Sequence, residues 1–231
     1  MDNFNCEIQD RDVEILKFGI EMKFFDFDSI SALFFKSNDS ARKRIRSLEK
    51  SNLIKSIRPF PGELKKIYIV TNKGSKDLYK KTNQKSYLIM SSPKFSKSFF
   101  AHDFFVIKSR ILLEKQKKSI QWRSERRLIL DTFYQRLNIS RDFLPDAIFQ
   151  TQNNKLCAFE FENTQKSEKA LMDKFLRIKT IIESENPPFE ICVVVTSTDK
   201  LKRKIKSITE EISSRIFVFS YLDIKDGNYE Q

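Results

Sequence analysis

The second half of the chain alternates short apolar runs with amphipathic helical segments, and this pattern limits the possible folds more than any other feature. Runs of about four to eight apolar residues are typical of buried strands, whereas apolar residues repeating every three to four positions are typical of helices. The strands are expected at residues 120–126, 144–150, 156–163, 190–196 and 216–222, and the helices at about 102–116, 168–183 and 199–213. This order predicts an α/β domain built on a mixed sheet.

The first third of the chain predicts a smaller domain of three helices and a hairpin. Helical patterns over residues 11–22 and about 28–36 precede a third helical segment, NDSARKRIRSLEKSNLI. Its Ala41, Ile45 and Leu48 recur at helical spacing, so these three side chains are expected to face the core.

The hairpin follows this third helix. Two short strands, at residues 53–57 and 67–71, flank the segment RPFPGELKK, in which proline and glycine favour a turn. Three helices followed by a basic hairpin is the order of a winged helix-turn-helix, whose recognition helix enters the major groove of DNA. We predict such a domain over residues 1–85, followed by a Ser/Lys-rich linker over residues 86–100.

Positive charge is concentrated in this predicted domain. Residues 39–81 contain 13 Lys or Arg against 4 Asp or Glu, a net +9 of the +12 carried by the whole chain. Such a segment indicates a polyanionic partner, either nucleic acid or an acidic membrane surface, although a charge run alone is often only a solvated helix face. The candidate DNA-binding residues are Arg42, Lys43, Arg44, Arg46, Lys50, Arg58, Lys65 and Lys66.

Scarce residue types exclude several chemistries. The four glycines form neither a phosphate loop nor a dinucleotide fingerprint. A single histidine excludes a zinc finger or a His-cluster metal site, so any metal must be held mainly by carboxylates. The three cysteines have no CxxC spacing, and Cys157 and Cys192, in apolar strand-like runs, are expected to be small buried residues in a reducing cytoplasm. We see no secretory signal and no apolar run of the roughly 18 residues that a membrane span needs, so a cytoplasmic protein is expected.

Three carboxylates occur in the strand-rich stretch LPDAIFQTQNNKLCAFEFENTQKS. Alternation along a strand places Glu160 and Glu162 on one face and Phe159 and Phe161 on the other, and pairing about the polar turn brings Asp146 near the two glutamates. Carboxylates in an apolar setting need neutralisation by a cation or by protons. Mg²⁺ or Mn²⁺ would suit such oxygen ligands and would activate an attacking oxygen in phosphodiester cleavage. The alternative is an acidic strand face that is simply exposed to solvent.

The same residues resemble the core of the PD-(D/E)xK nucleases. Asp146, a spacer and Glu160-x-Glu162 follow the family's pattern, with Glu162 in place of the usual lysine. In that family the lysine helps to position or deprotonate the nucleophile. The resemblance therefore implies either another role for Glu162 or a displaced lysine, for which Lys166 is the candidate.

A wider series of motifs extends the resemblance over about residues 11–200. The predicted winged helix precedes His102-Asp103, the sequence WRSE that ends at Glu125, PDA around Asp146, and FEFENTQKS. In this order the chain resembles the replication-relaxation family and the related MobC-type plasmid mobilisation relaxases. The resemblance implies a restriction-endonuclease-like mixed sheet flanked by helices over residues 101–231. It also implies metal-dependent, site-specific nicking at a plasmid transfer or replication origin, with Asp146, Glu160 and Glu162 as the acidic centre. Relaxosome or coupling proteins would be further partners.

Other residues near these motifs have competing interpretations. Glu125 could complete the acidic centre from a neighbouring strand, or pair with a nearby arginine such as Arg126. His102 has the ordinary pKa for proton transfer near neutrality, yet it could merely pack or cap a helix. Tyr134 is the tyrosine that we would test for a covalent intermediate.

Two other classes of function remain open. The departure at Glu162 is compatible with a non-catalytic DNA-binding accessory protein of replication or mobilisation, built on a decayed nuclease fold. A transcriptional regulator whose second domain binds a ligand or dimerises is the third hypothesis. Metal-dependent cleavage would separate the nicking enzyme from both.

Overall fold

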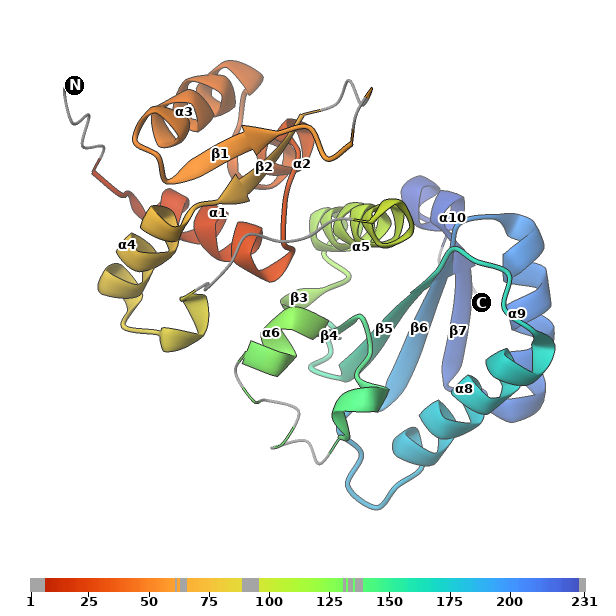
Figure 1. Cartoon of the computed structure of the whole chain (residues 1–231). Helices are drawn as coiled ribbons and strands as arrows, with labels where there is room; N and C mark the ends of the chain where they lie inside the picture. Colours follow the sequence, from red (N-terminus) through yellow and green to blue (C-terminus); the bar gives the residue numbers. More distant parts are fainter. Residues whose placement is uncertain are drawn as a thin grey trace. The chain divides into compact units, whose positions relative to one another are not determined.

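The chain divides into two compact units, Met1–Phe100 and Ala101–Gln231, each with its own β-sheet (Figure 1). The computed structural model describes residues 7–60, 62, 66–88, 96–130, 132, 135 and 139–228. The expected combination of helices with a mixed sheet is confirmed.

The first unit contains helices and one antiparallel hairpin. Its elements are α1 (Asp10–Glu21), α2 (Phe27–Phe34), α3 (Asn38–Lys50), β1 (Ile54–Ile57), β2 (Ile67–Val70), α4 (Asn72–Thr82) and the 3₁₀ turn η1 (Lys85–Tyr87). Short polar caps begin two of the helices: Asp26 accepts a hydrogen bond from Ser29 N in α2, and Ser37 accepts one from Ser40 N in α3. Such caps satisfy backbone donors that have no partner inside the helix.

The inward face of α3 is the one predicted from its sequence. Ala41, Ile45 and Leu48 are at most 2% exposed. A close approach also fixes α4 against the hairpin, because a Cβ atom at Gly74 would lie only 2.1 Å from the carbonyl oxygen of Leu53. A side chain at this position would therefore push the helix away from the hairpin.

The second unit is built on a five-stranded mixed sheet. Its strands, in spatial order, are β3 (Ile120–Ser124), β4 (Ala147–Gln150), β5 (Leu156–Glu162), β6 (Ile191–Thr196) and β7 (Ile216–Ser220). The pairs β3–β4 and β4–β5 are antiparallel, whereas β5–β6 and β6–β7 are parallel. The helices are α5 (Lys97–Lys115), α6 (Glu125–Leu130), α8 (Glu168–Ile182), α9 (Asp199–Ile212) and α10 (Tyr221–Asp226), with a 3₁₀ turn η2 (Arg141–Phe143).

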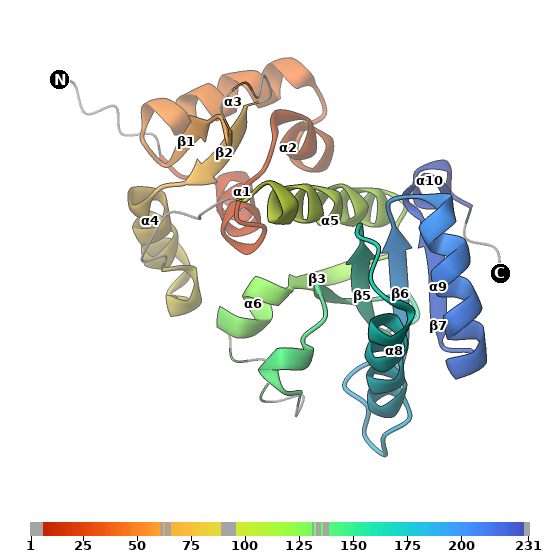
Figure 2. The same cartoon turned by 45° about the vertical axis from the view of Figure 1, so that its right-hand side comes forward.

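Helices pack on both faces of this sheet. The helices α8 and α9 lie along one face (Figures 1 and 2), where Leu171, Phe175 and Ile205 join a buried core with alternate residues of the strands. The helix α5 packs on the other face, where the ring of Phe105 stacks on that of Phe161 at 5.1 Å. The odd-numbered residues of β5 thus face α5 and its even-numbered residues face α8.

Two of the expected strands end early because helices begin there. The strand expected at 120–126 ends at Ser124, and α6 begins at Glu125. The strand expected at 216–222 ends at Ser220, whose side chain caps α10 by accepting a hydrogen bond from Asp223 N. Within the described residues, no helix has the length and apolar character to cross a bilayer.

Candidate active site and nucleic-acid surface

The pairing of β4 with β5 brings Asp146 to the glutamates. Ala147 pairs with Phe159 in antiparallel register, so Asp146, one residue earlier, comes beside Glu160. Asp146 Oδ2 accepts a hydrogen bond of 2.7 Å from the backbone N–H of Phe161. The backbone of one strand therefore holds the carboxylate of the other, at the carboxyl end of β5, where ligands commonly bind in open α/β sheets.

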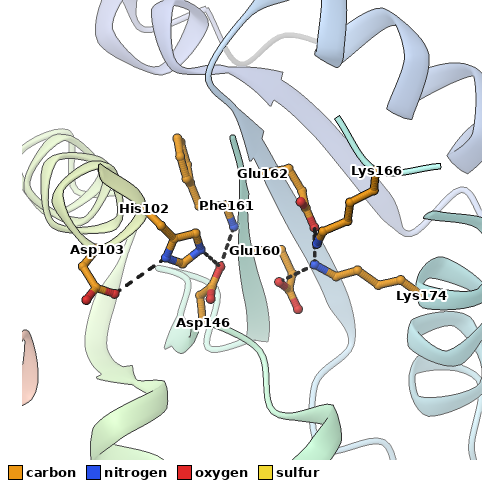
Figure 3. Close-up of polar contacts among 8 residues, drawn as sticks. All are labelled: His102, Asp103, Asp146, Glu160, Phe161, Glu162, Lys166 and Lys174. Carbon is orange, nitrogen blue, oxygen red and sulfur yellow. Dashed lines mark hydrogen bonds and ion pairs between the residues drawn. The ribbon is translucent and has the colours of Figure 1, made fainter. Parts of the chain in front are cut away.

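His102, in α5, is the second partner of Asp146. Its Nε2 lies 3.2 Å from Asp146 Oδ2, and its Nδ1 lies 3.7 Å from Asp103 Oδ1 (Figure 3). Burial alone would lower the pKa of His102, but hydrogen bonds and charges from Asp103 and Asp146 outweigh it and raise the pKa to about 10. The imidazole is therefore charged at neutral pH. Two carboxylates thus stabilise the protonated form of this histidine.

Glu160 and Glu162 share a lysine that the sequence patterns did not single out. Lys174 Nζ, from α8, lies 2.8 Å from Glu160 Oε2 and 2.5 Å from Glu162 Oε1 (Figure 3). Lys166 Nζ lies 2.8 Å from the same Glu162 oxygen. Both glutamates are buried, with exposed fractions of 8% and 2%. The alternative of an acidic strand face that is simply exposed to solvent is therefore wrong.

The electrostatics of this cluster differ between the carboxylates. Burial raises the pKa of Glu160, Lys174 lowers it, and the charge of Asp146 raises it further. The pKa of Glu160 reaches about 7 as a result. Burial would also raise the pKa of Asp146, but His102, Lys174 and the Phe161 N–H hold it below its usual value. The glutamates in turn raise the pKa of Lys174 against the effect of its burial. Each of the three carboxylates is thus in contact with at least one cation, from Lys166, Lys174 or His102.

The three carboxylates do not form the expected single cluster of metal ligands. Within the part of the chain that the structure describes, no group of three or more His, Cys, Asp or Glu side chains is arranged to hold a metal ion. Glu162 is paired with Lys166 and Lys174, whereas Asp146 and Glu160 lie next to each other on neighbouring strands (Figure 3). Glu162 is therefore linked to Glu160 through Lys174, and its carboxylate is occupied by two lysines.

Glu125 differs from the expectation in its backbone position. It is the first residue of α6 and its side chain is exposed, instead of lying on a neighbouring strand of the acidic centre. Its backbone N–H donates to the carbonyl oxygen of Asp146 at 2.7 Å. Glu125 therefore helps to hold the Asp146 backbone. Tyr134 lies outside the described residues.

A signal for Lys174 was present in the sequence. On α8, Leu171, Phe175 and Ile178 form the buried stripe, and Lys174 occupies a position three residues after Leu171 on the same side. A lysine on the apolar stripe of a helix indicates a buried partner of opposite charge. The partners themselves lie 12 and 14 residues earlier in the chain.

The first unit presents most of the predicted DNA-binding cations to solvent. Arg42, Lys43, Arg46 and Lys50 of α3 are exposed, as are Arg58 and Lys66 in the segment between β1 and β2. Lys65 lies outside the described residues.

Arg44 is different from its neighbours on α3. It forms an ion pair with the fully buried carboxylate of Asp12 in α1, with Arg44 Nε lying 2.7 Å from Asp12 Oδ1. Its guanidinium also donates to the carbonyl oxygen of Glu7. Arg44 is therefore a weaker candidate for DNA binding than its exposed neighbours on α3, because its guanidinium pairs with Asp12 between α3 and α1.

Comparisons with known proteins support one family. No curated protein and no solved structure matches the chain. A family model described as Replication-relaxation matches residues 21–187, which span α2, α3, the hairpin, β3, β4, β5 and α8. Since this match covers well over half of the sequence and includes both the basic helix and the carboxylate cluster, the chain belongs to the replication-relaxation family.

Proposed function

We propose that this chain is a metal-dependent relaxase that nicks one DNA strand at a plasmid transfer or replication origin. Membership of the replication-relaxation family indicates a role in replication or mobilisation. The proposal assigns duplex binding to the first unit, as a winged helix whose α3 enters the major groove. It assigns strand cleavage to the second unit.

The single observation that carries the cleavage proposal is the juxtaposition of Asp146, Glu160 and Lys174. Two carboxylates come from neighbouring strands and one ammonium comes from α8, 2.8 Å from Glu160 (Figure 3). This supports the hypothesis of a displaced lysine, with Lys174 as a better candidate than Lys166 because it contacts both glutamates. Lys166, the candidate from the sequence, contacts Glu162 alone of the two glutamates.

The donor set fits Mg²⁺ or Mn²⁺ bound by two carboxylates. Asp146 and Glu160 would hold the ion, and phosphate oxygens and water would complete a coordination that Mg²⁺ commonly adopts with one or two carboxylates. Burial raises the pKa of Glu160, and the neighbouring charge of Asp146 raises it further against the effect of Lys174. When bound, the ion would supply an activated oxygen nucleophile and stabilise charge on the phosphodiester.

The chain's own residues would position this chemistry. The Phe161 N–H and protonated His102 fix the Asp146 carboxylate, since both contact its Oδ2. Lys174 would stabilise the negative charge that develops on the cleaved phosphate.

The test is the conversion of a supercoiled origin plasmid to open circles in the presence of Mg²⁺ or Mn²⁺. We expect the wild type to nick, and Asp146→Ala and Glu160→Gln to lose nicking while both retain duplex binding. Glu183→Gln is the matched control, because Glu183 is an exposed acid at the end of α8, outside the cluster. Full nicking by Asp146→Ala or Glu160→Gln would show that the carboxylate pair is not the cleavage centre.

A non-catalytic accessory protein is the second candidate. The favouring observation is that Lys174 already pairs with Glu160 and Glu162, so the protein neutralises much of this buried charge by itself. If the wild type binds the origin plasmid but leaves it supercoiled with either metal, this second function replaces the first.

A further inference from the structure

A pocket of about 430 Å³ lies next to the carboxylate cluster, between α8 and the turn η2. Glu160, Lys166 and Lys174 border it on the side of the cluster, and Phe143 and Arg177 lie farther along its wall. Its volume falls in the range of about 300–1,000 Å³ that is usual for small-ligand sites. The pocket therefore has room for a group the size of a nucleotide.

An aromatic ring and a guanidinium form one part of this wall. The ring of Phe143 is 45% exposed, and the guanidinium carbon of Arg177 lies 5.1 Å from its centroid. Phe143 is a large apolar side chain that lines the pocket and leaves almost half of its surface open to water. Exposed aromatic rings beside arginine are the platforms on which unpaired bases stack.

The charged side chains that line the pocket indicate which kind of ligand it can bind. The ammonium group of Lys174 is paired with the two glutamates. The Lys166 side chain, in contrast, keeps 41% of its surface exposed, and Arg177 is exposed on α8. These two cations suit a phosphate group. The carboxylates of Glu160 and Asp173 also line the pocket and disfavour a ligand that is anionic throughout. A flat, neutral base joined to a phosphate matches both features.

We propose that this pocket holds one unpaired nucleotide of the DNA strand that is cut, with its base on Phe143 and its phosphate beside Lys166 and Arg177. The inference rests on the proposed nicking function and adds to it the recognition of a base beside the cut. A base inside a duplex is covered by its neighbours, so only a nucleotide that has left the stack can enter such a pocket. The pocket thus selects strand that is already locally melted.

The first experiment compares single-stranded and duplex DNA of the same sequence, in EDTA, with the full-length protein. An oligonucleotide of about ten nucleotides is long enough for one such site. Removal of one base-stacking interaction corresponds to roughly a five- to 150-fold weaker affinity. We expect Phe143→Ala to weaken single-strand binding by this factor and to leave duplex binding unchanged. Phe143→Tyr should restore the single-strand affinity, because it keeps the ring.

Matched controls separate the pocket from the general surface. Leu176→Ala removes an apolar side chain of equal exposure, 45%, from α8 outside the pocket, and should change neither affinity. Arg177→Gln should weaken single-strand binding, whereas Lys169→Gln, an exposed cation on the same helix, should not. Arg177→Gln also carries the test if Phe143→Ala fails to fold, as judged by circular dichroism.

A fluorescent base gives a second, direct measurement. A 2-aminopurine placed in the single strand should be quenched on binding to the wild type and to Phe143→Tyr, and less so on binding to Phe143→Ala. A free deoxynucleoside monophosphate is the second arm, because it offers the same base and phosphate outside a strand. It should compete far more weakly than the oligonucleotide.

The proposal would be overturned if single-strand binding and quenching were unchanged in both Phe143→Ala and Arg177→Gln. It would also be overturned if these variants bound duplex and single-stranded DNA equally weakly relative to the wild type. Competition by the free nucleotide as strong as that by the oligonucleotide would overturn it as well. Since these measurements need no metal and no cleavage, they are independent of the nicking assay. An inactive Asp146–Glu160 centre with intact Phe143-dependent binding would refute only the nicking function. Active nicking without that binding would refute only the nucleotide pocket.

Discussion

Lys174 balances two buried glutamates, and its role can be separated from that of Lys166. Lys174→Met removes the cation shared by Glu160 and Glu162, which leaves the buried Glu160 without its cation and Glu162 with Lys166 alone. Since breaking a buried ion pair costs about 3 kcal/mol, we expect the free energy of unfolding in urea to fall by about that amount.

The controls for this prediction come from the same cluster. Lys166→Met should cost less than about 1 kcal/mol, because the Lys166 side chain is 41% exposed and its ion pair is screened by water. Combining Lys174→Met with Glu160→Gln and Glu162→Gln should recover much of the stability. Equal decreases in the two lysine variants would show that Lys174 has no special role.

Arg44 provides a second prediction for a single residue, because the other cations of α3 are exposed to solvent. Arg44→Gln leaves the fully buried carboxylate of Asp12 without its cation and should lower the free energy of unfolding by about 2 kcal/mol. Arg42→Gln should change it by less than about 0.5 kcal/mol, since the Arg42 side chain is 60% exposed. Urea unfolding of both variants checks this, and a stable Arg44→Gln would make Arg44 as strong a candidate for DNA binding as its neighbours.

At the scale of elements, α10 begins with a reciprocal cap that predicts a pH dependence. Asp223 accepts hydrogen bonds from Ser220 N and from Lys202 Nζ, and these contacts lower its pKa although its burial raises it. A carboxyl with a lowered folded pKa stabilises the protein above its unfolded pKa, about 3.9, and loses this contribution as the pH falls through the folded value.

Asp223→Ala should therefore cost about 1 kcal/mol at neutral pH, the usual value of a helix cap. The difference between variant and wild type should shrink below pH about 3.9, as the wild-type carboxyl becomes protonated. Thermal unfolding of both proteins across this pH range is the measurement. A difference that stays constant down to the lowest pH would assign the effect to packing instead of charge.

At the scale of the whole molecule, substitutions in the first unit should weaken duplex binding without altering the carboxylate cluster of the second unit. Replacing Arg42, Lys43 and Arg46 by glutamine removes three exposed cations from α3 and none from the carboxylate cluster. Duplex binding should weaken. Each removed cation that binds a phosphate should also reduce the steepness of log affinity plotted against log salt concentration by roughly 0.9. Titrations of origin DNA at several salt concentrations measure this slope. An unchanged slope would place the duplex-binding surface elsewhere.

Much of the fold could be predicted from local sequence. Apolar spacing located every strand of both sheets and the buried face of α3, with Ala41, Ile45 and Leu48 inside as expected. Alternation along β5 placed Glu160 and Glu162 on the same face. These features depend on residues a few positions apart, whose side-chain directions follow from the backbone periodicity itself.

The tertiary structure alone decided which charges meet. His102 and Asp146 are 44 residues apart, Arg44 and Asp12 are 32 apart, and Lys174 reaches Glu160 only because α8 docks on β5. No local pattern specifies such partners, because they depend on strand register and helix docking, which long-range packing sets. The sequence by itself therefore determined the strands, the longer helices and the candidate acids, but not the short helices α6 and α10. Packing determined that Lys174 balances the glutamates, that His102 is held beside Asp103 and Asp146, and that Glu125 begins a helix instead of continuing β3.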